Sequence, residues 1–223
     1  MALSHLMARD GVAAPDDPLA LRPPHFPAKA RAVISLFMRG GPSHVDTFDP
    51  KPVLTRHDGQ PLPDSFKNLD LAQVNTSDGK LMGSTFPFRK RGQSGIEISD
   101  LFPHLAEHAD ELAVIRSCYH DLFIHGSAIT LMQSGTVLLG HPSVGSWVSY
   151  GLGCESDSLP AYTAMTDAFF ANGPTMYGSG FLPAVYQGTY LQTKGAPIQN
   201  LKRPPGMSAG GQRALLDQLG SWN

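Results

Sequence analysis

The predicted fold is decided by residues 32–38, Ala32-Val-Ile-Ser-Leu-Phe-Met38, which form a nearly continuous apolar run. Lys29 and Arg31 precede this run, and Gly40-Gly41-Pro42 follows it. A short apolar run bounded by polar and turn residues is typical of a strand that is buried on both faces of a parallel sheet. We therefore expect the folded part of the chain to begin here.

The residues before the run lack the pattern of a folded element. Residues 10–31 are rich in Pro, Asp and Ala, which favours an extended segment. Residues 1–15 resemble the tail of an export signal with small residues near a cleavage site, although the basic head and most of the apolar stretch are missing. We expect 1–31 to be a signal remnant and lead-in, 32–223 to be the folded region, and the protein to be periplasmic or secreted.

Helical and strand-like patterns alternate after the first run. The stretch from Asp49 to about Ile96 is polar and rich in Pro and Gly, and it is predicted to be a long loop. Alternation of strands and helices predicts an α/β fold with a mainly parallel sheet that is covered by helices. The predicted strands are 32–38, 112–117 and 160–165, and the predicted helices are capped or begin near Ser99, Gly126, Ser143 and Ser208.

The helix predicted to start at the cap Ser143 has an apolar stripe. Its members are Val144, Trp147, Val148 and Tyr150, which recur at roughly helical spacing. We expect this face to pack against the core. Gly135 is expected to end the preceding helix.

The composition excludes several functional classes. A chain of 223 residues with 41% hydrophobic residues can bury one sizeable core. The net charge of -2 gives no field that would gather nucleic acid, and no run approaches the ~18 to 20 apolar residues that span a bilayer. Cys118 and Cys154 lack the spacing of a metal knuckle and are interpreted as free thiols, with a disulfide left open in an oxidising compartment.

Polar residues follow two of the predicted strands. Ligands bind at the carboxyl ends of strands in open parallel sheets. His44, Asp46 and Asp49 follow the first strand, whereas His125 follows the second and immediately precedes a helix. Carboxylates suit a hard divalent cation such as Ca²⁺, Mg²⁺ or Zn²⁺, and the free amide groups of a helix amino terminus suit a phosphate or sulfate. The predicted anion ligands are Gly126 and Ser127.

Each of these residues has a plainer interpretation. Asp46 and Asp49 are able to fix a turn, because Asp often does so before a proline such as Pro50. His44 fits a surface position or a group behind the ligands as well as it fits a ligand. His125 is equally able to act as a helix cap. These alternatives stay open at the level of sequence.

One longer stretch resembles the signature of a large bacterial sulfatase-like family that was long listed as a domain of unknown function and whose members carry twin-arginine export signals. The stretch is Leu36-Phe-Met-Arg-Gly-Gly-Pro-Ser-His-Val-Asp-Thr-Phe-Asp-Pro-Lys-Pro52. The resemblance implies membership of the alkaline phosphatase superfamily and a three-layer α/β sandwich with metal ions at the carboxyl edge of its sheet. It continues through His57-Asp-Gly-Gln-Pro-Leu-Pro63, Gln93-Ser-Gly95, Ser99-Asp-Leu-Phe-Pro-His104, Leu112-Ala-Val-Ile-Arg-Ser117 and Gly180-Phe-Leu-Pro-Ala184.

The resemblance also implies site residues and shows departures. Matching Gln133-Ser-Gly135 to the end of the superfamily's nucleophile helix places His125 at the nucleophile position, where relatives have a hydroxyl or formylglycine. Gly40-Gly41 replaces the carboxylate expected at the end of the first strand. The implied remaining Asp and His ligands would lie in a carboxyl-terminal half, so the resemblance implies an incomplete domain.

The sequence therefore predicts a metal-dependent hydrolase of sulfate or phosphate esters. Asp46 is the leading metal ligand, joined by His44 and Asp49, and His125 is the candidate catalytic residue. The expected substrate is a sulfated or phosphorylated small molecule or polysaccharide outside the cytoplasm. The alternatives are a non-catalytic module that binds a glycan or a protein, and an inactive fragment.

Overall fold

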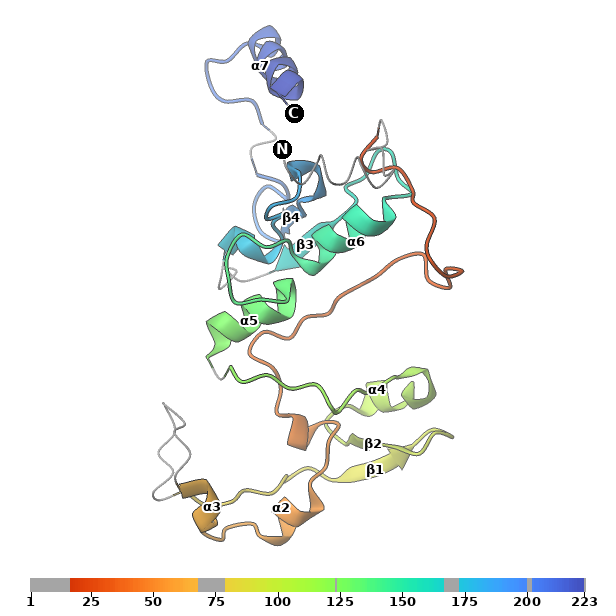
Figure 1. The fold of residues 1–223 in the computed structure, drawn as a ribbon, viewed down its shortest axis with the longest axis vertical. Coiled ribbons are helices and arrows are strands. Elements are labelled where there is room, and N and C mark those ends of the chain that lie inside the picture. Colours follow the sequence, from red (N-terminus) through yellow and green to blue (C-terminus); the bar gives the residue numbers. More distant parts are fainter. Residues whose placement is uncertain (1–16, 68–78, 123, 167–172, 200–201, 223) are drawn as a thin grey trace. The chain divides into compact units, whose positions relative to one another are not determined.

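The computed structural model describes residues 17–67, 79–122, 124–166, 173–199 and 202–222, and these form a mixed α/β fold of short elements (Figure 1). The chain divides into two compact units. Unit 1 comprises Met1–Ser35 and Leu122–Asn223, and unit 2 comprises Leu36–Asp121. Each unit has its own small sheet, so each is described by itself.

Unit 2 is built around an antiparallel hairpin. Strands β1 (Phe88–Arg91) and β2 (Ile96–Ser99) pair from Phe88↔Ser99 to Arg91↔Ile96. The Asp110 carboxylate accepts the backbone N–H groups of Gln93 and Ser94 at 2.9 and 2.8 Å, which fixes the hairpin turn. The other elements are the 3-10 turns η1 (His44–Asp46) and η2 (Ala109–Glu111) and the helices α2 (Pro52–Arg56), α3 (Asp64–Lys67) and α4 (Pro103–Ala106).

The core of unit 2 is small. Ile98 is fully buried between Ala106 of α4 and Ala109 of η2. Partly buried apolar side chains pack around these three residues, and they are Phe48, Ile96, Phe102 and Leu112. Pro103 lies in the first turn of α4, where its missing N–H would have no partner in any case.

Unit 1 carries the longer helices and a parallel strand pair. Strands β3 (Thr163–Thr166) and β4 (Thr189–Gln192) pair in parallel from Thr163↔Thr189 to Thr166↔Gln192. The helices are α5 (His125–Ser134), α6 (Val144–Leu152) and α7 (Ala209–Trp222), and the 3-10 turns are η3 (Gly173–Met176) and η4 (Ala184–Tyr186).

The boundaries of these helices follow the capping residues. Ser143 accepts the N–H of Ser146 at the start of α6, and Ser208 accepts the N–H of Gly211 at 3.0 Å at the start of α7. Gly135 ends α5 with φ of 76°, a left-handed conformation that favours glycine. The caps predicted at Ser143, Gly135 and Ser208 are therefore confirmed.

The interior of α6 is lined by hydroxyl groups rather than by its apolar stripe. Ser146 is fully buried, and its hydroxyl donates to the Gly178 carbonyl at 3.0 Å and bonds the Ser143 hydroxyl at 3.0 Å. In contrast, 42% of Trp147 and 48% of Val144 remain exposed. The prediction that the apolar stripe packs on the core is wrong for Val144, Trp147 and Val148, whereas Tyr150 is partly buried against the ring of Tyr186. Small hydroxyl side chains allow the 178–180 loop to approach the helix closely, which a Trp or Val would prevent.

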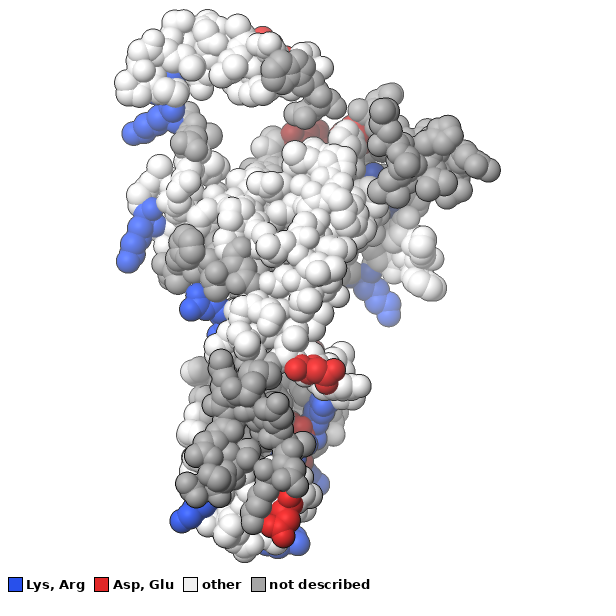
Figure 2. Space-filling view, turned by 60° about the vertical axis from the view of Figure 1, so that its left-hand side comes forward, with Lys and Arg blue, Asp and Glu red and all other residues white. Residues whose placement is uncertain are grey.

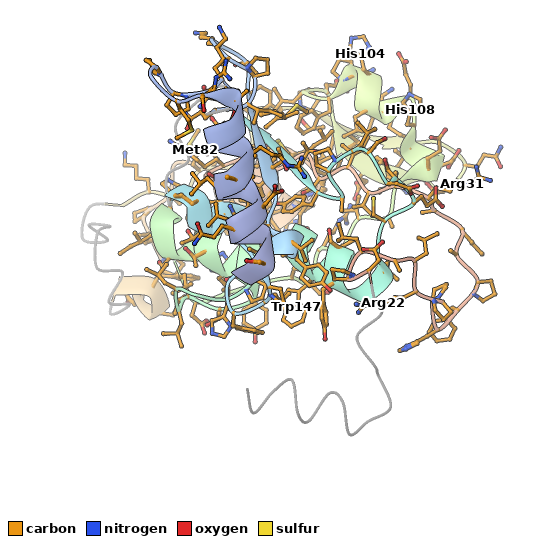
Figure 3. The ribbon with its side chains drawn as sticks, turned by 90° about the horizontal axis from the view of Figure 1, so that it is seen from above. Arg22, Arg31, Met82, His104, His108 and Trp147 are labelled. Carbon is orange, nitrogen blue, oxygen red and sulfur yellow. The ribbon has the colours of Figure 1, made fainter. Side chains whose placement is uncertain are left out.

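An aromatic network ties residues 17–22 to α6. Tyr150 meets Trp147 and Tyr186 edge-to-face at centroid distances of 5.9 and 5.3 Å, and the Arg22 guanidinium lies 5.0 Å from the Tyr150 ring centre. Figure 3 shows Arg22 and Trp147 beside this helix. The backbone N–H of Cys154 also donates to Leu19 at 2.8 Å. Residues 17–22 of the predicted lead-in therefore pack against the rest of unit 1.

Two predicted strands are absent from the structure. Residues 32–38 and 112–117 form no strand, and Ile34 and Ile115 are 83% and 70% exposed. An apolar run becomes a strand only when a partner supplies hydrogen bonds to its backbone, and these runs pair with no strand in the part of the chain that is described. The strand predicted at 160–165 is found as β3.

The sheets also differ from the prediction. The described sheets are one antiparallel pair and one parallel pair, and neither is closed or layered into a sandwich. Strand β1 lies inside the stretch that was predicted to be loop, and β2 begins where that stretch ends. Arg89 and Arg91 of β1 both pair with Asp100, at 3.0 and 2.9 Å. Only the coarser prediction, a mixed α/β fold, is confirmed. Within the described ranges, no helix is both long and apolar enough to cross a bilayer.

Candidate functional site

The His44–Asp49 loop of unit 2 is a tightly wound turn. The carbonyl of His44 accepts the backbone N–H groups of Thr47, Phe48 and Asp49 at 3.2, 3.2 and 3.0 Å. The Asp46 N–H donates to Ser43 at 3.1 Å. Convergence of these bonds fixes the directions in which the side chains of the loop point.

Two residues of this loop anchor it to the core of unit 2. Thr47 is buried, its hydroxyl donates to the Ser43 carbonyl at 3.0 Å, and its own carbonyl accepts the Ser99 N–H at 3.0 Å. The Phe48 ring stacks on Phe102 with centroids 5.4 Å apart. Because Thr47 and Phe48 face the core, their neighbours Asp46 and Asp49 are left partly exposed.

Asp46 is held in its charged form. The hydroxyl of Ser84 donates to its carboxylate and does most to lower the pKa of Asp46, the Ser43 hydroxyl adds to this lowering, and the His44 imidazole contributes its charge. Partial burial opposes these effects. The carboxylate is therefore ionised throughout the neutral range and presents acceptor oxygens at the surface of the unit.

Asp49 is held in its charged form by cations. Lys51 donates to its carboxylate at 2.7 Å and is the main cause of the lowered pKa of Asp49. Arg116 and His44 lower this pKa further through their charges. The His44 imidazole thus acts on both carboxylates, and Arg116 acts on that of Asp49.

The remaining predicted site residues lie at the start of α5 in unit 1. His125 is the first residue of the helix and is exposed. The Ser127 hydroxyl donates to the Ile124 carbonyl at 3.2 Å, and Thr130 donates to the Gly126 carbonyl at 3.1 Å. No side chain caps this helix start. His125 is part of the first turn, so the alternative in which its side chain serves as the cap is not observed.

The structure groups the predicted residues into two sets. His44, Asp46 and Asp49 form one set in unit 2, and His125 with its two following residues forms another in unit 1. Their meeting around one ligand stays a prediction. The export signal predicted in residues 1–15 lies outside the described residues.

The donor set limits which metal ion fits. Among the residues that the structure describes, no three His, Cys, Asp or Glu side chains are grouped to hold an ion. Zn²⁺ sites need three or four protein ligands and Ca²⁺ sites six to eight oxygens. Mg²⁺ commonly uses one or two carboxylates and completes its shell with water and substrate oxygens. Of the three candidate ions, Mg²⁺ fits Asp46 and Asp49 best.

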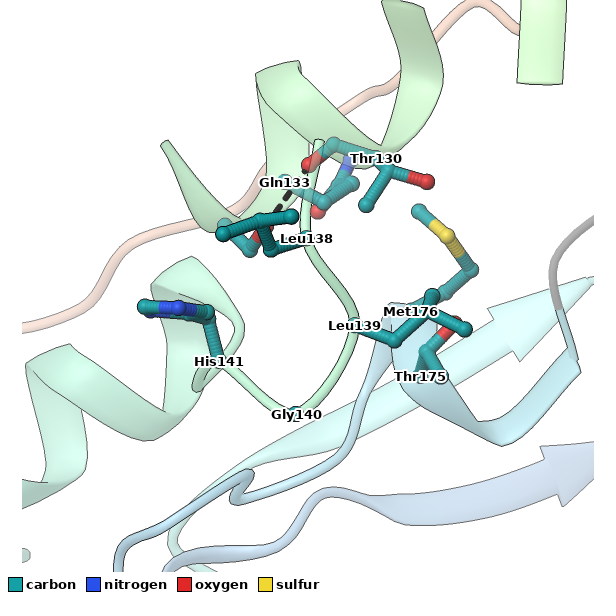
Figure 4. Close-up of a pocket in the computed structure, with 9 residues that line it drawn as sticks. Thr130, Gln133, Leu138, Leu139, Gly140, His141, Thr175 and Met176 are labelled. Carbon is teal, nitrogen blue, oxygen red and sulfur yellow. Dashed lines mark hydrogen bonds between the residues drawn. The ribbon is translucent and has the colours of Figure 1, made fainter. Parts of the chain in front are cut away.

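Two cavities differ greatly in size. One lies between α5 and η3 in unit 1, beside Thr130 and Met176, and its volume of about 10 Å³ admits no more than a water molecule (Figure 4). The other lies in unit 2 between the β1–β2 hairpin and residues 114–117, and its volume is about 620 Å³. Only the second is large enough for an organic ligand.

The basic side chains on the face drawn in Figure 2 and the two cysteines do not cluster. Figure 2 shows Lys and Arg side chains scattered among uncharged residues on the face it presents. Cys118 is exposed, Cys154 is partly buried, and both are free thiols, one in each unit. The interpretation of the two cysteines as unpaired thiols is confirmed.

Sequence reasoning missed Ser84 and Arg116. Ser84 lies in the stretch predicted to be loop, and Arg116 lies in a predicted strand, yet they act on Asp46 and Asp49 respectively. The glycine before Ser84, Gly83, is the sequence feature that relates to the position of Ser84. Its Cα lies so close to α2 that a Cβ would come within 2.6 Å of the Thr55 Cα, and its N–H donates to Asp58 at 2.8 Å. This close approach sets the position of Ser84.

Comparison with known proteins identifies one family. No curated protein and no solved structure matches the chain. A family model described as a protein of unknown function, DUF1501, matches residues 30–223. This match corrects the resemblance to sulfatase-like members of the alkaline phosphatase superfamily, because it assigns nearly the whole folded region to a distinct family. The chain belongs to the DUF1501 family of proteins of unknown function.

Proposed function

We propose that the His44–Asp49 loop is the polar centre of a site that hydrolyses phosphate or sulfate esters with the help of Mg²⁺. The observation that carries this proposal is the arrangement of the loop. Thr47 and Phe48 anchor it, while Asp46 and Asp49 stay ionised and partly exposed next to His44.

The roles of the residues follow from their chemistry. Asp46 and Asp49 would hold the ion, which when bound stabilises negative charge on the ester oxygens. His44 is exposed beside both carboxylates, and an imidazole there is suited to moving a proton to or from the reacting oxygen. Arg116 adds a fixed positive charge that favours an anionic substrate.

The residues of α5 are assigned a separate role. His125 is proposed as the catalytic group that attacks or positions the ester, and the amide groups of Gly126 and Ser127 as ligands of its anionic part. The exposed position of His125 at a helix start supports this assignment. If a His125→Ala variant keeps full activity, the role assigned to His125 is refuted, and the proposal for the loop is unaffected.

We also propose a complete architecture and a cellular location for the protein. A three-layer sandwich with a mainly parallel sheet would require residues 32–38 and 112–117 to acquire strand partners, and their exposed apolar side chains support such pairing. Slow amide hydrogen exchange in both segments is expected in that case. We also propose a periplasmic or secreted protein, which cell fractionation tests directly.

Hydrolysis of 4-nitrophenyl phosphate and 4-nitrophenyl sulfate, measured with and without Mg²⁺, tests the proposal. The wild-type chain is expected to need the ion, and Asp46→Asn and Asp49→Asn are each expected to reduce the rate by about 100-fold, because each removes a charged ligand. Glu107→Gln is the control, since Glu107 is an exposed carboxylate outside the loop. Equal rates in all four proteins would refute the proposal.

A second candidate function is a non-catalytic module that binds a glycan or a protein. The exposed side of α6 favours it. Trp147 is 42% exposed and Phe181 52% exposed, and the two rings meet edge-to-face at 5.8 Å. Exposed aromatic rings of this kind are common at binding surfaces. Glycan-array binding that is lost in Trp147→Ala but kept in Asp46→Asn would favour this module over the hydrolase.

A further inference from the structure

The cavity of about 620 Å³ in unit 2 is a groove with two walls. One wall is the β1–β2 hairpin, and the other is the segment that follows η2 and that forms no strand. Its volume lies within the range of small-molecule sites, roughly 300–1,000 Å³. The residues that matter for its chemistry are Lys90, Ile96, Glu97, Val114, Ile115 and Arg116.

The middle of this groove is apolar. Ile96 and Val114 are partly exposed, and Ile115 is 70% exposed. An Ile side chain left open to solvent in a groove gains free energy when a carbon skeleton covers it. These walls therefore favour a ligand with an apolar body.

The polar groups of the groove carry an excess of positive charge. Lys90 and Arg116 line it, against the single carboxylate of Glu97, which lies directly across the hairpin from Lys90. Among the described residues, Lys90 and Arg116 have no ion pair within 4 Å, whereas Arg89 and Arg91 on the same strand both pair with Asp100. The unpaired cations make an anionic ligand the complementary one.

Arg116 connects the groove with the His44–Asp49 loop. It lines the groove, and its charge also acts on Asp49, although the direct partner of Asp49 is Lys51. The donors of the Arg116 guanidinium are therefore not consumed by Asp49. A ligand in the groove that contacts Arg116 would have its anionic end on the side of the groove toward Asp49.

We infer that the groove between the hairpin and residues 114–117 is the binding site for an anionic organic molecule. Its apolar body lies against Ile96, Val114 and Ile115, and its phosphate or sulfate group is bound by Arg116. Lys90 selects a second acidic substituent. Assigning this molecule as the substrate rests on the proposed function, whereas binding itself requires no catalysis.

The test is direct binding of 4-nitrobenzylphosphonate, a phosphate-ester mimic with a carbon–phosphorus bond that is not hydrolysed, measured by calorimetry or by NMR. Arg116→Gln is expected to weaken binding at least tenfold, because it removes a charge-assisted contact. Ile115→Ser is expected to weaken it several-fold through lost apolar contact. Both residues are exposed, so the fold of the variants is expected to be unchanged, as checked by circular dichroism.

Lys80→Gln is the matched control, because Lys80 is an exposed cation of the same unit outside the groove. It should bind as the wild type does, and 4-nitrobenzyl alcohol, which lacks the anion, should bind far more weakly than the phosphonate. The inference is overturned if the wild type does not bind the phosphonate, or if Arg116→Gln and Ile115→Ser bind it with wild-type affinity.

The two proposals fail in different ways. Asp46→Asn is expected to slow hydrolysis of 4-nitrophenyl phosphate by about 100-fold and to leave phosphonate binding at the wild-type level, since Asp46 does not line the groove. Binding that depends on Arg116 in a protein without hydrolytic activity would sink the proposed function and support the groove. If Arg116→Gln changes neither hydrolysis nor phosphonate binding, the groove is refuted as the binding site and the proposed function still stands.

Discussion

In α6 of unit 1 the hydroxyl side chains face inward and the large apolar side chains face solvent, whereas the loop of unit 2 buries an aromatic ring and exposes two acids. Ser146 is fully buried with its hydroxyl satisfied by Ser143 and Gly178, and Trp147 beside it is 42% exposed. In the loop, Phe48 packs inward and Asp49 stays partly exposed.

The difference separates polar groups that build the fold from polar groups that are available to a ligand. A buried hydroxyl whose partners all belong to the protein has no capacity left for a substrate, and it stabilises the contact between two segments. The acids of the loop are also hydrogen-bonded, but both residues stay partly exposed. Changes in α6 should therefore alter stability, and changes in the loop should alter chemistry.

The largest effect is expected from Gly180→Ala, which disrupts the packing of the 178–180 loop against residues 140–142, the segment that leads into α6. A Cβ on Gly180 would lie 2.4 Å from the His141 carbonyl carbon and 2.5 Å from the Pro142 nitrogen, and φ at this position is 57°. Backbone strain and overpacking each cost roughly 1–3 kcal/mol, so we expect a loss of at least ~2 kcal/mol in the free energy of unfolding.

Urea unfolding followed by Trp147 fluorescence in a Trp222→Phe background measures this loss. Gly140→Ala is the matched control, because its φ is also positive, at 89°, while a Cβ there would meet no atom within 4 Å. It should cost about 1 kcal/mol through backbone strain alone. Equal costs at the two positions would show that the loop does not pack against residues 140–142 as described.

A smaller effect is expected from Ser146→Ala, which tests whether the buried hydroxyl stabilises the fold. The change removes bonds to the Ser143 hydroxyl and the Gly178 carbonyl, and it should cost about 1–2 kcal/mol in the same urea experiment. The hydroxyl of Ser149 bonds only the Gly145 carbonyl one turn earlier in its own helix, so Ser149→Ala should cost less than ~0.5 kcal/mol. Similar costs for the two variants would contradict the role assigned to Ser146.

Helix boundaries were predictable because they depend on local chemistry. Ser143, Gly135 and Ser208 cap or end their helices through contacts within a few residues. Strands were not predictable in this way, because a strand depends on a partner that is distant in the sequence. Residues 32–38 have the composition of a buried strand but no ladder, while the polar strand Phe88–Arg91 has a ladder, paired with β2 and held by Asp100.

The candidate site was likewise predictable where it depends on local sequence and not where it depends on distant contacts. Asp46 and Asp49 were singled out because they are closely spaced acids after an apolar run, and the structure shows both held in the charged form. Ser84 was missed because its contact with Asp46 depends on the close approach of Gly83 to α2, which no local pattern encodes. The outward face of α6 was predicted wrongly because helical spacing reveals a stripe but not the side of the protein on which it lies.

The smallest effect on stability, and the one that most sharpens the contrast with α6, is expected from Ser84→Ala. Loss of the Ser84 hydroxyl should raise the pKa of Asp46 toward its ordinary value, because this hydrogen bond is the main cause of the lowering. A lowered pKa in the folded state contributes stability that is complete above the ordinary aspartate value of about 3.9 and is lost as the pH falls through the folded value. In the variant this contribution should therefore be smaller at neutral pH, and Asp46 should titrate at a higher pH than in the wild type.

Titration of the Asp46 side-chain carboxyl carbon by NMR measures the change directly. Asp110 is the internal control, because the backbone amides of Gln93 and Ser94 lower its pKa independently of Ser84. Its titration should be the same in both proteins. If Asp46 titrates identically with and without the Ser84 hydroxyl, the loop is not held as its contacts indicate, and the acid that the proposed site depends on would be an ordinary surface carboxylate.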